Sequence, residues 1–170
     1  MEKDVVSVAR REELPQIMQL YRSLIGSKGC TWDLEYPSPE EIEIDIANGS
    51  LFCIRAHGAV VAAAFAGTDE DEKALRCWSK EMENPCFLAR VAVDRRYQKK
   101  GLAKRLLTHI EENAGARGFD GICLLVNETN EAAASLYEAC GYAVAGRAHL
   151  YGIHWVCREK CLRVSRADER

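Results

Sequence analysis

One stretch, between Phe87 and Ile110, constrains the fold of this chain more than any other. It opens with an apolar run over residues 87–93 and passes through a turn at Gly101. It then repeats apolar side chains at helical spacing, namely Leu102, Ala103, Leu106, Leu107 and Ile110. The stretch therefore predicts a strand, a tight turn and a helix, in that order.

The start of this helix is a predicted seat for phosphate. The first N–H groups of a helix lack intrahelical partners, and the macrodipole adds partial positive charge there. Gly101 lets the backbone approach an anion, and basic side chains lie around it: Arg95, Arg96, Lys99, Lys100, Lys104 and Arg105. Neither a Rossmann fingerprint nor a P-loop is present. By itself, the motif fits an ordinary helix start with a solvated basic face equally well.

Charge and hydropathy exclude two classes of partner. The 170 residues carry a net charge of −3, with a pI of about 5.9, whereas a nucleic-acid-binding protein needs a broad basic face. We therefore expect no nucleic-acid partner, and the local basic cluster suits one small polyphosphate.

No run of about 18 apolar residues occurs, and the charged N-terminus lacks the apolar core of a signal peptide. We expect no membrane span and a cytoplasmic location.

The eight cysteines form no C-x-x-C pair, and several lie within apolar runs (Cys30, Cys53, Cys77, Cys86, Cys123, Cys140, Cys157 and Cys161). A free cysteine in such a run behaves as a small hydrophobe, so we expect reduced structural thiols. The histidines form no metal-ligand set with them. No metal is expected.

The remaining residues alternate between strand and helix periodicity. Apolar runs predict strands over residues 5–9, 51–55, 60–66, 87–93, 121–126, 142–145 and 153–157. Helices are predicted from Arg11 to Gly26, from Ser38 to Gly49, from 102 to about 116–118, and over 127–140. Ser38, Pro39 and Glu41 form a strong helix start. The segment 68–85 has no clear period, although Trp78 and Met82 could line a short helix.

This order of elements predicts an α+β fold, an α/β/α sandwich in which helices flank a central mixed, mostly antiparallel sheet. We expect a single domain over residues 1–161 and a charged, flexible tail over residues 162–170.

A second motif lies in the predicted helix over 127–140. Asn130 and Tyr137 are seven residues apart, about two helical turns, so they share a face with Ala133 and Ala134 between them. An amide, a phenol and only methyl groups between them leave room for a slender ligand. The alternative is a core helix with Asn130 as its N-cap and Tyr137 packed under the sheet.

The two motifs together resemble the GCN5-related N-acetyltransferase (GNAT) family. The resemblance rests on three stretches in the order that the family has: Leu88-Ala89-Arg90-Val91-Ala92-Val93, Tyr97-Gln98-Lys99-Lys100-Gly101-Leu102-Ala103, and residues 126–142. It implies a GNAT-like sheet, a single acetyltransferase domain over residues 1–161, and acetyl-CoA as co-substrate without a metal. Lys99 and Ala103 stand where the family often has glycines.

The resemblance also implies the binding residues. The strand at Val91, Ala92 and Val93 would splay from its neighbour and bind pantetheine through its backbone. The following turn would hold the pyrophosphate, through Gln98, Lys99, Lys100, Gly101, Leu102, Ala103 and Lys104. Asn130 would contact the pantetheine or nucleotide arm. Tyr137 would lie near the sulfur.

The reaction itself sets further requirements. An amine of pKa about 10.4 must lose a proton before it attacks the thioester, and a backbone N–H near Val91 is the natural donor to the oxyanion. Tyr137 is expected to stabilise the departing thiolate more than to protonate it. The base stays open between Glu35, Glu83 and a water relay. Three aromatic side chains are candidates for the acceptor pocket, although each could equally pack in the core: Trp32, Tyr36 and Tyr151.

We therefore expect an N-acetyltransferase that moves acetyl directly from acetyl-CoA, in a ternary complex, to a primary amine of a small molecule or peptide. A homodimer is possible. The first alternative is an acyltransferase with another acyl-CoA or a hydroxyl acceptor. The second is a non-catalytic acyl-CoA-binding sensor or regulatory module.

Overall fold

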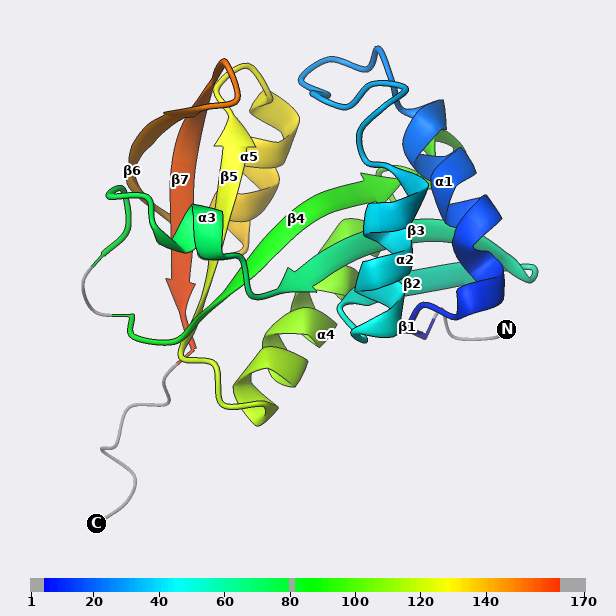
Figure 1. The fold of residues 1–170 in the computed structure, drawn as a ribbon, viewed down its shortest axis with the longest axis horizontal. Helices are drawn as coiled ribbons and strands as arrows, with labels where there is room; N and C mark the ends of the chain where they lie inside the picture. The colour runs from blue at the N-terminus through cyan, green and yellow to red at the C-terminus, as the bar shows by residue number, and fades with distance from the viewer. Residues whose placement is uncertain (1–4, 80–81, 163–170) are drawn as a thin grey trace.

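Seven strands pair into one sheet in the order β1-β2-β3-β4-β5-β7-β6 (Figure 1). The computed structural model describes residues 5–79 and 82–162. The strands are β1 (Ser7–Val8), β2 (Leu51–Ala56), β3 (Ala59–Gly67), β4 (Pro85–Val93), β5 (Gly121–Asn127), β6 (Ala143–Leu150) and β7 (Ile153–Cys161). Every neighbouring pair is antiparallel except β4 and β5, which are parallel. The predicted mixed, mostly antiparallel sheet is confirmed.

Helices cover both faces of this sheet, as the α+β prediction requires. They are α1 (Leu14–Ser23), α2 (Pro39–Ala47), α3 (Glu70–Lys73), α4 (Leu102–Ala116) and α5 (Glu131–Ala139), with 3-10 turns at Arg11–Glu13 and Arg95–Tyr97. On one face, α1 and α2 bury Ile17 and Ile42 against β2 and β3. On the other, α4 and α5 bury Leu106 and Tyr137. The molecule therefore has three layers (Figure 1).

Local sequence signals set most element boundaries. Ser38 Oγ accepts the Glu41 N–H at 3.2 Å, which begins α2 as predicted. The last two strands extend beyond the predicted 142–145 and 153–157, because β6 pairs with β7 up to Leu150 and the end of β7 pairs with β5 up to Cys161. The helix predicted over 127–140 begins only after Asn130. The prediction of a tail over 162–170 falls outside the described residues, apart from Leu162.

The sheet forks between its two parallel strands. β4 pairs with β5 from Pro85 opposite Gly121 to Leu88 opposite Leu124, and no further. Beyond Leu88, β4 continues to Val93 beside β3 alone. We call the opening between the ends of β4 and β5 the fork. It is the splayed strand that the family resemblance implied.

The segment 68–85 contains the short helix α3, which ends before Trp78 and Met82, so these two residues do not line a helix as the sequence suggested. After α3, Cys77 and Ser79 contact β7. The Trp78 indole N–H donates to the carbonyl oxygen of Glu72 at 2.7 Å, and its ring meets Phe87 of β4 edge-on.

No helix in the described ranges has the length and apolar character needed to span a bilayer. The cytoplasmic location stays a prediction.

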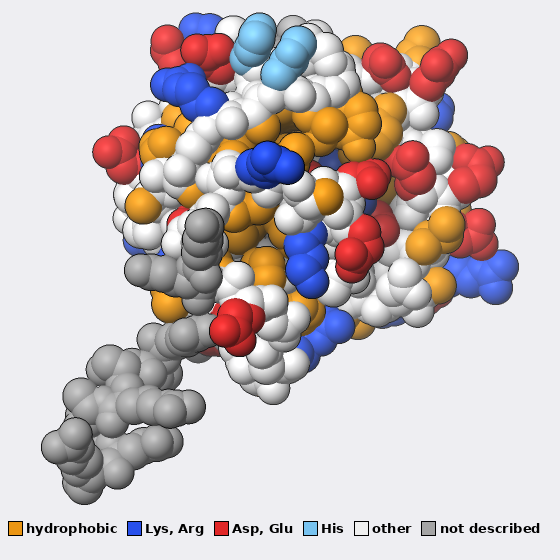
Figure 2. All heavy atoms as spheres, turned by 60° about the vertical axis from the view of Figure 1, so that its left-hand side comes forward, with side chains coloured by type: hydrophobic (Ala, Val, Ile, Leu, Met, Phe, Trp, Pro, Cys, Tyr) orange, Lys and Arg blue, Asp and Glu red, His pale blue; other side chains and the backbone are white. Residues whose placement is uncertain are grey.

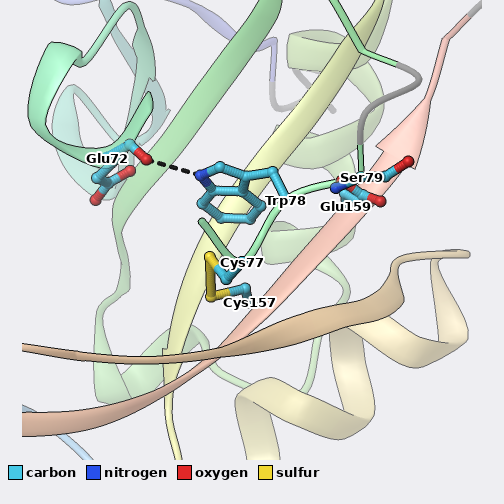
Figure 3. Close-up of a disulfide and its surroundings, with 6 residues drawn as sticks. All are labelled: Glu72, Cys77, Trp78, Ser79, Cys157 and Glu159. Atoms are coloured by element: carbon cyan, nitrogen blue, oxygen red, sulfur yellow. Dashed lines mark hydrogen bonds between the residues drawn. A yellow bond between two sulfur atoms is a disulfide. The ribbon is translucent and has the colours of Figure 1, made fainter. Parts of the chain in front are cut away.

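One cysteine expectation is wrong. Cys77, in the segment after α3, forms a disulfide with Cys157 of β7, 80 residues away in sequence (Figure 3). The sequence could not indicate this pair because neither residue has a spacing motif, and only the path of segment 68–85 over β7 brings them together. The remaining six cysteines are free: Cys30, Cys53, Cys86, Cys123, Cys140 and Cys161.

A buried ion pair joins the first helical turn to the sheet. Both carboxylate oxygens of Glu13 accept from the Arg55 guanidinium at 2.6 Å, and Arg55 also donates to Ser7 of β1 at 2.7 Å. The Arg55 hydrogen bonds lower the pKa of Glu13 to about 2, against the opposing effect of burial. A side chain that is 4% exposed cannot lose this partner to water without cost.

We expect Glu13→Gln to lower the free energy of unfolding by about 3 kcal/mol at pH 7, because the pKa shift of the native carboxylate is lost. The native pKa lies below the usual 4.5. The wild-type stabilisation is therefore complete above pH 4.5 and disappears as the pH falls toward 2. Urea unfolding at pH 7 and pH 3 measures both effects. Glu12→Gln is the control, since Glu12 is exposed, and equal losses in both variants would contradict the assignment.

The disulfide predicts a defined alkylation pattern. Alkylation of the unfolded, unreduced protein should modify six cysteines, and prior reduction should raise the number to eight. Mass spectrometry of the peptides identifies the protected pair. Modification of Cys77 without reductant would exclude the cross-link.

Candidate functional site

The fork leaves one edge of β4 without a strand partner. Between Ala89 and Val93 this strand pairs with β3 on one side, and no described strand pairs with its other side. Backbone donors and acceptors on that edge need partners. The edge can therefore bind an extended ligand that carries amide groups of its own.

A bulge shapes this edge of β4. Ala63 of β3 faces Ala92 whereas Phe65 faces Ala89, so β4 holds one residue more than its partner. Arg90 adopts φ +52° in the bulge. Its carbonyl oxygen accepts from the hydroxyl of the buried Tyr21 at 2.9 Å. The distortion is thus held in place from the α1 side.

The Arg90 side chain lies on the α2 face of the sheet, where it contacts three other side chains. Its guanidinium donates to Asp45 at 2.6 Å and to the Tyr36 hydroxyl at 3.1 Å, and it stacks over the Phe65 ring. Burial raises the pKa of Asp45, and the Arg90 charge opposes that shift. Arg90 Nε is buried without a hydrogen-bond partner in the described part of the chain.

The turn after β4 has the form expected of an anion seat. The Gln98 side-chain amide donates to the Val93 carbonyl at 3.0 Å, which ties the turn to the strand. Lys99 and Gly101 both have positive φ, at +62° and +82°. Gly101 supplies no side chain to cap the first N–H groups of α4. A Cβ added at Gly101 would meet nothing within 4 Å, so this turn lies beside open space.

The side chains predicted to bind phosphate at this turn differ in their exposure to solvent. Lys99, Lys100 and Lys104 are exposed and can supply charge to the seat. Leu102 is buried in the core, so it can offer the seat only its backbone, and Ala103 is half-buried. These residues stay predictions for binding.

Asn130 and Tyr137, the residues of the second motif, both have structural roles. Asn130 Oδ1 accepts the Ala133 N–H at 3.1 Å, so Asn130 is the N-cap of α5. Gly29 of the α1–α2 loop packs so closely that an added Cβ would lie 2.6 Å from the Asn130 Cβ. Tyr137 is buried against Tyr142. Burial raises the pKa of Tyr137, which keeps its hydroxyl protonated and able to donate.

The candidate acceptor aromatics each have different partners. Trp32 meets the buried Tyr21 edge-on and packs with the core of the α1 face. Tyr36 holds Arg90, and Tyr151 lies in the β6–β7 turn with φ +57°. Desolvation and then the charges of Asp71, Asp69 and Glu72 raise the pKa of Tyr151.

Neither carboxylate chosen from the sequence is enclosed. Glu35 and Glu83 are both exposed. Glu72 of α3 was missed because it lies in the segment without a clear period, among other acidic residues that look like a solvated helix face. Its Oε2 is shielded from solvent and has no hydrogen-bond partner among the described residues. No group of three metal-ligating side chains occurs within the described ranges.

Comparison with known proteins connects this geometry to one family. The model of the acetyltransferase (GNAT) family matches residues 16–142. The ribosomal protein bS18 alanine N-acetyltransferase of Salmonella typhimurium is 32% identical over 75 residues, which cover 44% of this chain and 51% of that protein. The chain thus spans about half the length, or less, of the curated relatives it matches.

Solved structures agree in fold. The Escherichia coli ribosomal-protein-S18-alanine N-acetyltransferase superposes with a TM-score of 0.69 at 20% identity, covering 96% of this chain and 97% of that chain. A putative acetyltransferase from Salmonella typhimurium, solved with its cofactor acetyl-CoA, gives a TM-score of 0.74 at 14% identity and covers 96% of each chain.

Proposed function

Because the chain belongs to the acetyltransferase (GNAT) family, we propose that it transfers an acetyl group from acetyl-CoA to a primary amine. The observation that carries the proposal is the continuity of two features. The unpaired edge of β4 ends at Val93 and α4 begins at Leu102, so only the short segment 94–101 separates them. A pantetheine arm that ends in a pyrophosphate needs these two environments in this order.

The residues present fit the donor molecule. The β4 edge at Val91, Ala92 and Val93 would pair with the pantetheine amides. The α4 N–H groups with Gly101 and Lys104 would hold the pyrophosphate, as helix starts do for other phosphates. Asn130 already caps α5, so its amide N–H₂ is the part that would reach the pantetheine or nucleotide arm.

The chain would act on the reaction through two groups. Acetyl-CoA supplies the activated acetyl thioester. A backbone N–H near Val91 would donate to the carbonyl oxygen as negative charge develops on it. The Tyr137 hydroxyl would donate to the departing thiolate. A thiol of pKa about 8.5 is a stronger acid than a phenol, and burial weakens this phenol further as an acid, so Tyr137 stabilises the thiolate without giving up its proton.

The acceptor that we propose is the amine of a peptide or protein, with a small-molecule amine as the alternative. The relatives in Salmonella and Escherichia coli are named as alanine N-acetyltransferases of a ribosomal protein, which supports a peptide amine. Thiol release from acetyl-CoA, measured against a panel of peptide and small amines, tests this directly. Binding of acetyl-CoA without any acceleration by an amine would favour a sensor module.

Removing the positive charge of Lys104, near the start of α4, should weaken cofactor binding. We expect Lys104→Gln to raise the Kd for CoA about 5-fold, or about 1 kcal/mol, because a cation beside the pyrophosphate is lost. Arg117→Gln, at the other end of the same helix, should leave the Kd unchanged. Isothermal calorimetry measures both variants. Equal binding of CoA and NAD by the wild type would contradict the assigned seat.

Removing the Tyr137 hydroxyl should slow turnover and spare binding. We expect Tyr137→Phe to lower kcat about 10- to 100-fold, the effect of losing one hydrogen bond to a developing charge, with the Kd for acetyl-CoA near normal. Tyr142→Phe is the control, because its hydroxyl contacts Glu111 at 3.2 Å. It should reduce stability but not kcat. Unchanged turnover in Tyr137→Phe would remove the assigned role.

A further inference from the structure

We propose that Glu72 is the base that takes the proton from the acceptor ammonium, acting from the α1–α2 side of the fork. The inference rests on the proposed function and names the residue that this reaction requires. Three observations on the molecule support it: how the backbone of Glu72 is fixed, where its side chain lies, and what that side chain lacks.

The backbone of Glu72 is fixed from two sides although α3 has a single turn. Its N–H donates to the Asp69 carboxylate at 2.9 Å, and its carbonyl accepts from the Trp78 indole at 2.7 Å. Trp78 rests on Phe87 of β4, and the adjacent Cys77 is cross-linked to Cys157 of β7 (Figure 3). A short surface helix is thereby held at a defined place over the sheet.

The side chain lies near the point where β4 and β5 separate. Burial raises the pKa of the Cys123 thiol on β5, and the charges of Glu159 and then Glu72 add to that shift. Cys123 lies one residue before the last parallel pair. Burial also raises the pKa of Glu72, and the charge of Arg90 in the β4 bulge opposes that shift. Cys123 and Phe87 point away from the face that buries Leu88 and Tyr137, since side chains alternate along a strand. Glu72 and Tyr137 therefore lie on opposite sides of the fork.

This arrangement suits attack from one side and departure from the other. Tyr137 belongs to the α4–α5 side, where the donor thiol would lie, and Glu72 faces the side from which an acceptor would enter. Figure 2 shows exposed hydrophobic side chains on one face of the molecule, with both acidic and basic side chains around and among them.

One oxygen of the Glu72 carboxylate lacks the partner that a structural role would give it. Oε2 is buried and accepts no hydrogen bond from any described residue. The terminal nitrogens of Arg90 donate to Asp45 and Tyr36, and not to Glu72. Buried carboxylates that only stabilise a fold are normally hydrogen-bonded. An unpartnered one, held rigidly beside a reaction path, is available to a substrate.

The surroundings of Glu72 change its pKa in the direction that a general base requires. Burial, followed by the charge of Asp69, raises the pKa of Glu72 to about 7, and Arg90 opposes the shift. After burial and other nearby carboxylates, the charge of Glu72 also raises the pKa of Tyr151 in the β6–β7 turn and of Cys123 in β5. A base whose pKa lies near the working pH is the most effective one.

The proposed step balances without a further reactant. The ammonium of the acceptor gives one proton to the Glu72 carboxylate, and the neutral nitrogen forms a bond to the acetyl carbon. The carbon–sulfur bond breaks, and the electron pair leaves on sulfur. The second amine proton goes to the departing thiolate through solvent. Glu72 releases its proton to water before the next turnover.

Replacement by the isosteric amide tests the assignment. We expect Glu72→Gln to lower kcat/KM about 100-fold at pH 8, the usual scale of general-base catalysis, with the Kd for acetyl-CoA unchanged. The wild-type profile of kcat/KM should rise through an apparent pKa near 7, and the variant should lose that limb. Glu70→Gln removes the same charge from the same helix at an exposed position and should behave as wild type.

Thermal unfolding supplies a readout that needs no turnover. The native pKa of Glu72 lies above the usual 4.5, so ionising the buried carboxyl costs stability as the pH rises from 4.5 through 7. Glu72→Gln should therefore have nearly the wild-type Tm at pH 5 and a higher Tm than wild type at pH 8. A merely structural Glu72 would instead give a lower Tm in the variant at both values.

The two failures are distinguishable. A wild-type protein that binds acetyl-CoA but acetylates no amine would overturn the proposed function. A wild-type protein that acetylates an amine while Glu72→Gln keeps its rate and its ascending limb would overturn only the role of Glu72. A lower Tm for the variant at both pH values would also overturn that role.

Discussion

The pairing of β4 with β5 ends at Leu88 and Leu124, and the candidate site depends on that ending. A parallel pair that continued to Val93 would satisfy the backbone on both edges of β4 and leave no place for an extended ligand. Because it ends early, one face of the fork can receive the donor molecule and the other an acceptor. The turn into α4 then adds a charged terminus at the far end of the same edge.

The bulge at Arg90 lies in the part of β4 that has already separated from β5. A positive φ at a non-glycine residue costs on the order of 1 kcal/mol, and the surrounding contacts offset it. Tyr21 holds the Arg90 carbonyl from α1, Asp45 holds the guanidinium from α2, and the Phe65 ring supports it from β3. One distorted residue is thus contacted by three elements. The charge of the same side chain opposes the rise in the pKa of Glu72 that burial causes.

The sequence predicted the local structure around the candidate site. The turn at Gly101, the cap at Ser38 and the cap that Asn130 forms on α5 all follow from residues within about ten positions of one another. The binding roles of Asn130 and Tyr137 stay predictions. The fork was anticipated only through the family resemblance, because no periodicity indicates where a strand loses its neighbour. Arg90 and Glu72 were missed for a related reason. Their partners are far away in sequence, and Glu72 lies in a segment that packing, not propensity, places.

The close approach of Gly29 to Asn130 has a consequence for how a ligand enters. The α1–α2 loop belongs to the half of the molecule that contains β4, and Asn130 belongs to the half that contains β5. Their contact reconnects the two halves beyond the point where the strands part, and the Asn127 amide donates to the Gly29 carbonyl at 3.4 Å in support. The α1–α2 loop therefore closes the far end of the fork. A movement of that loop alone would widen the fork, because no strand pairing would have to break.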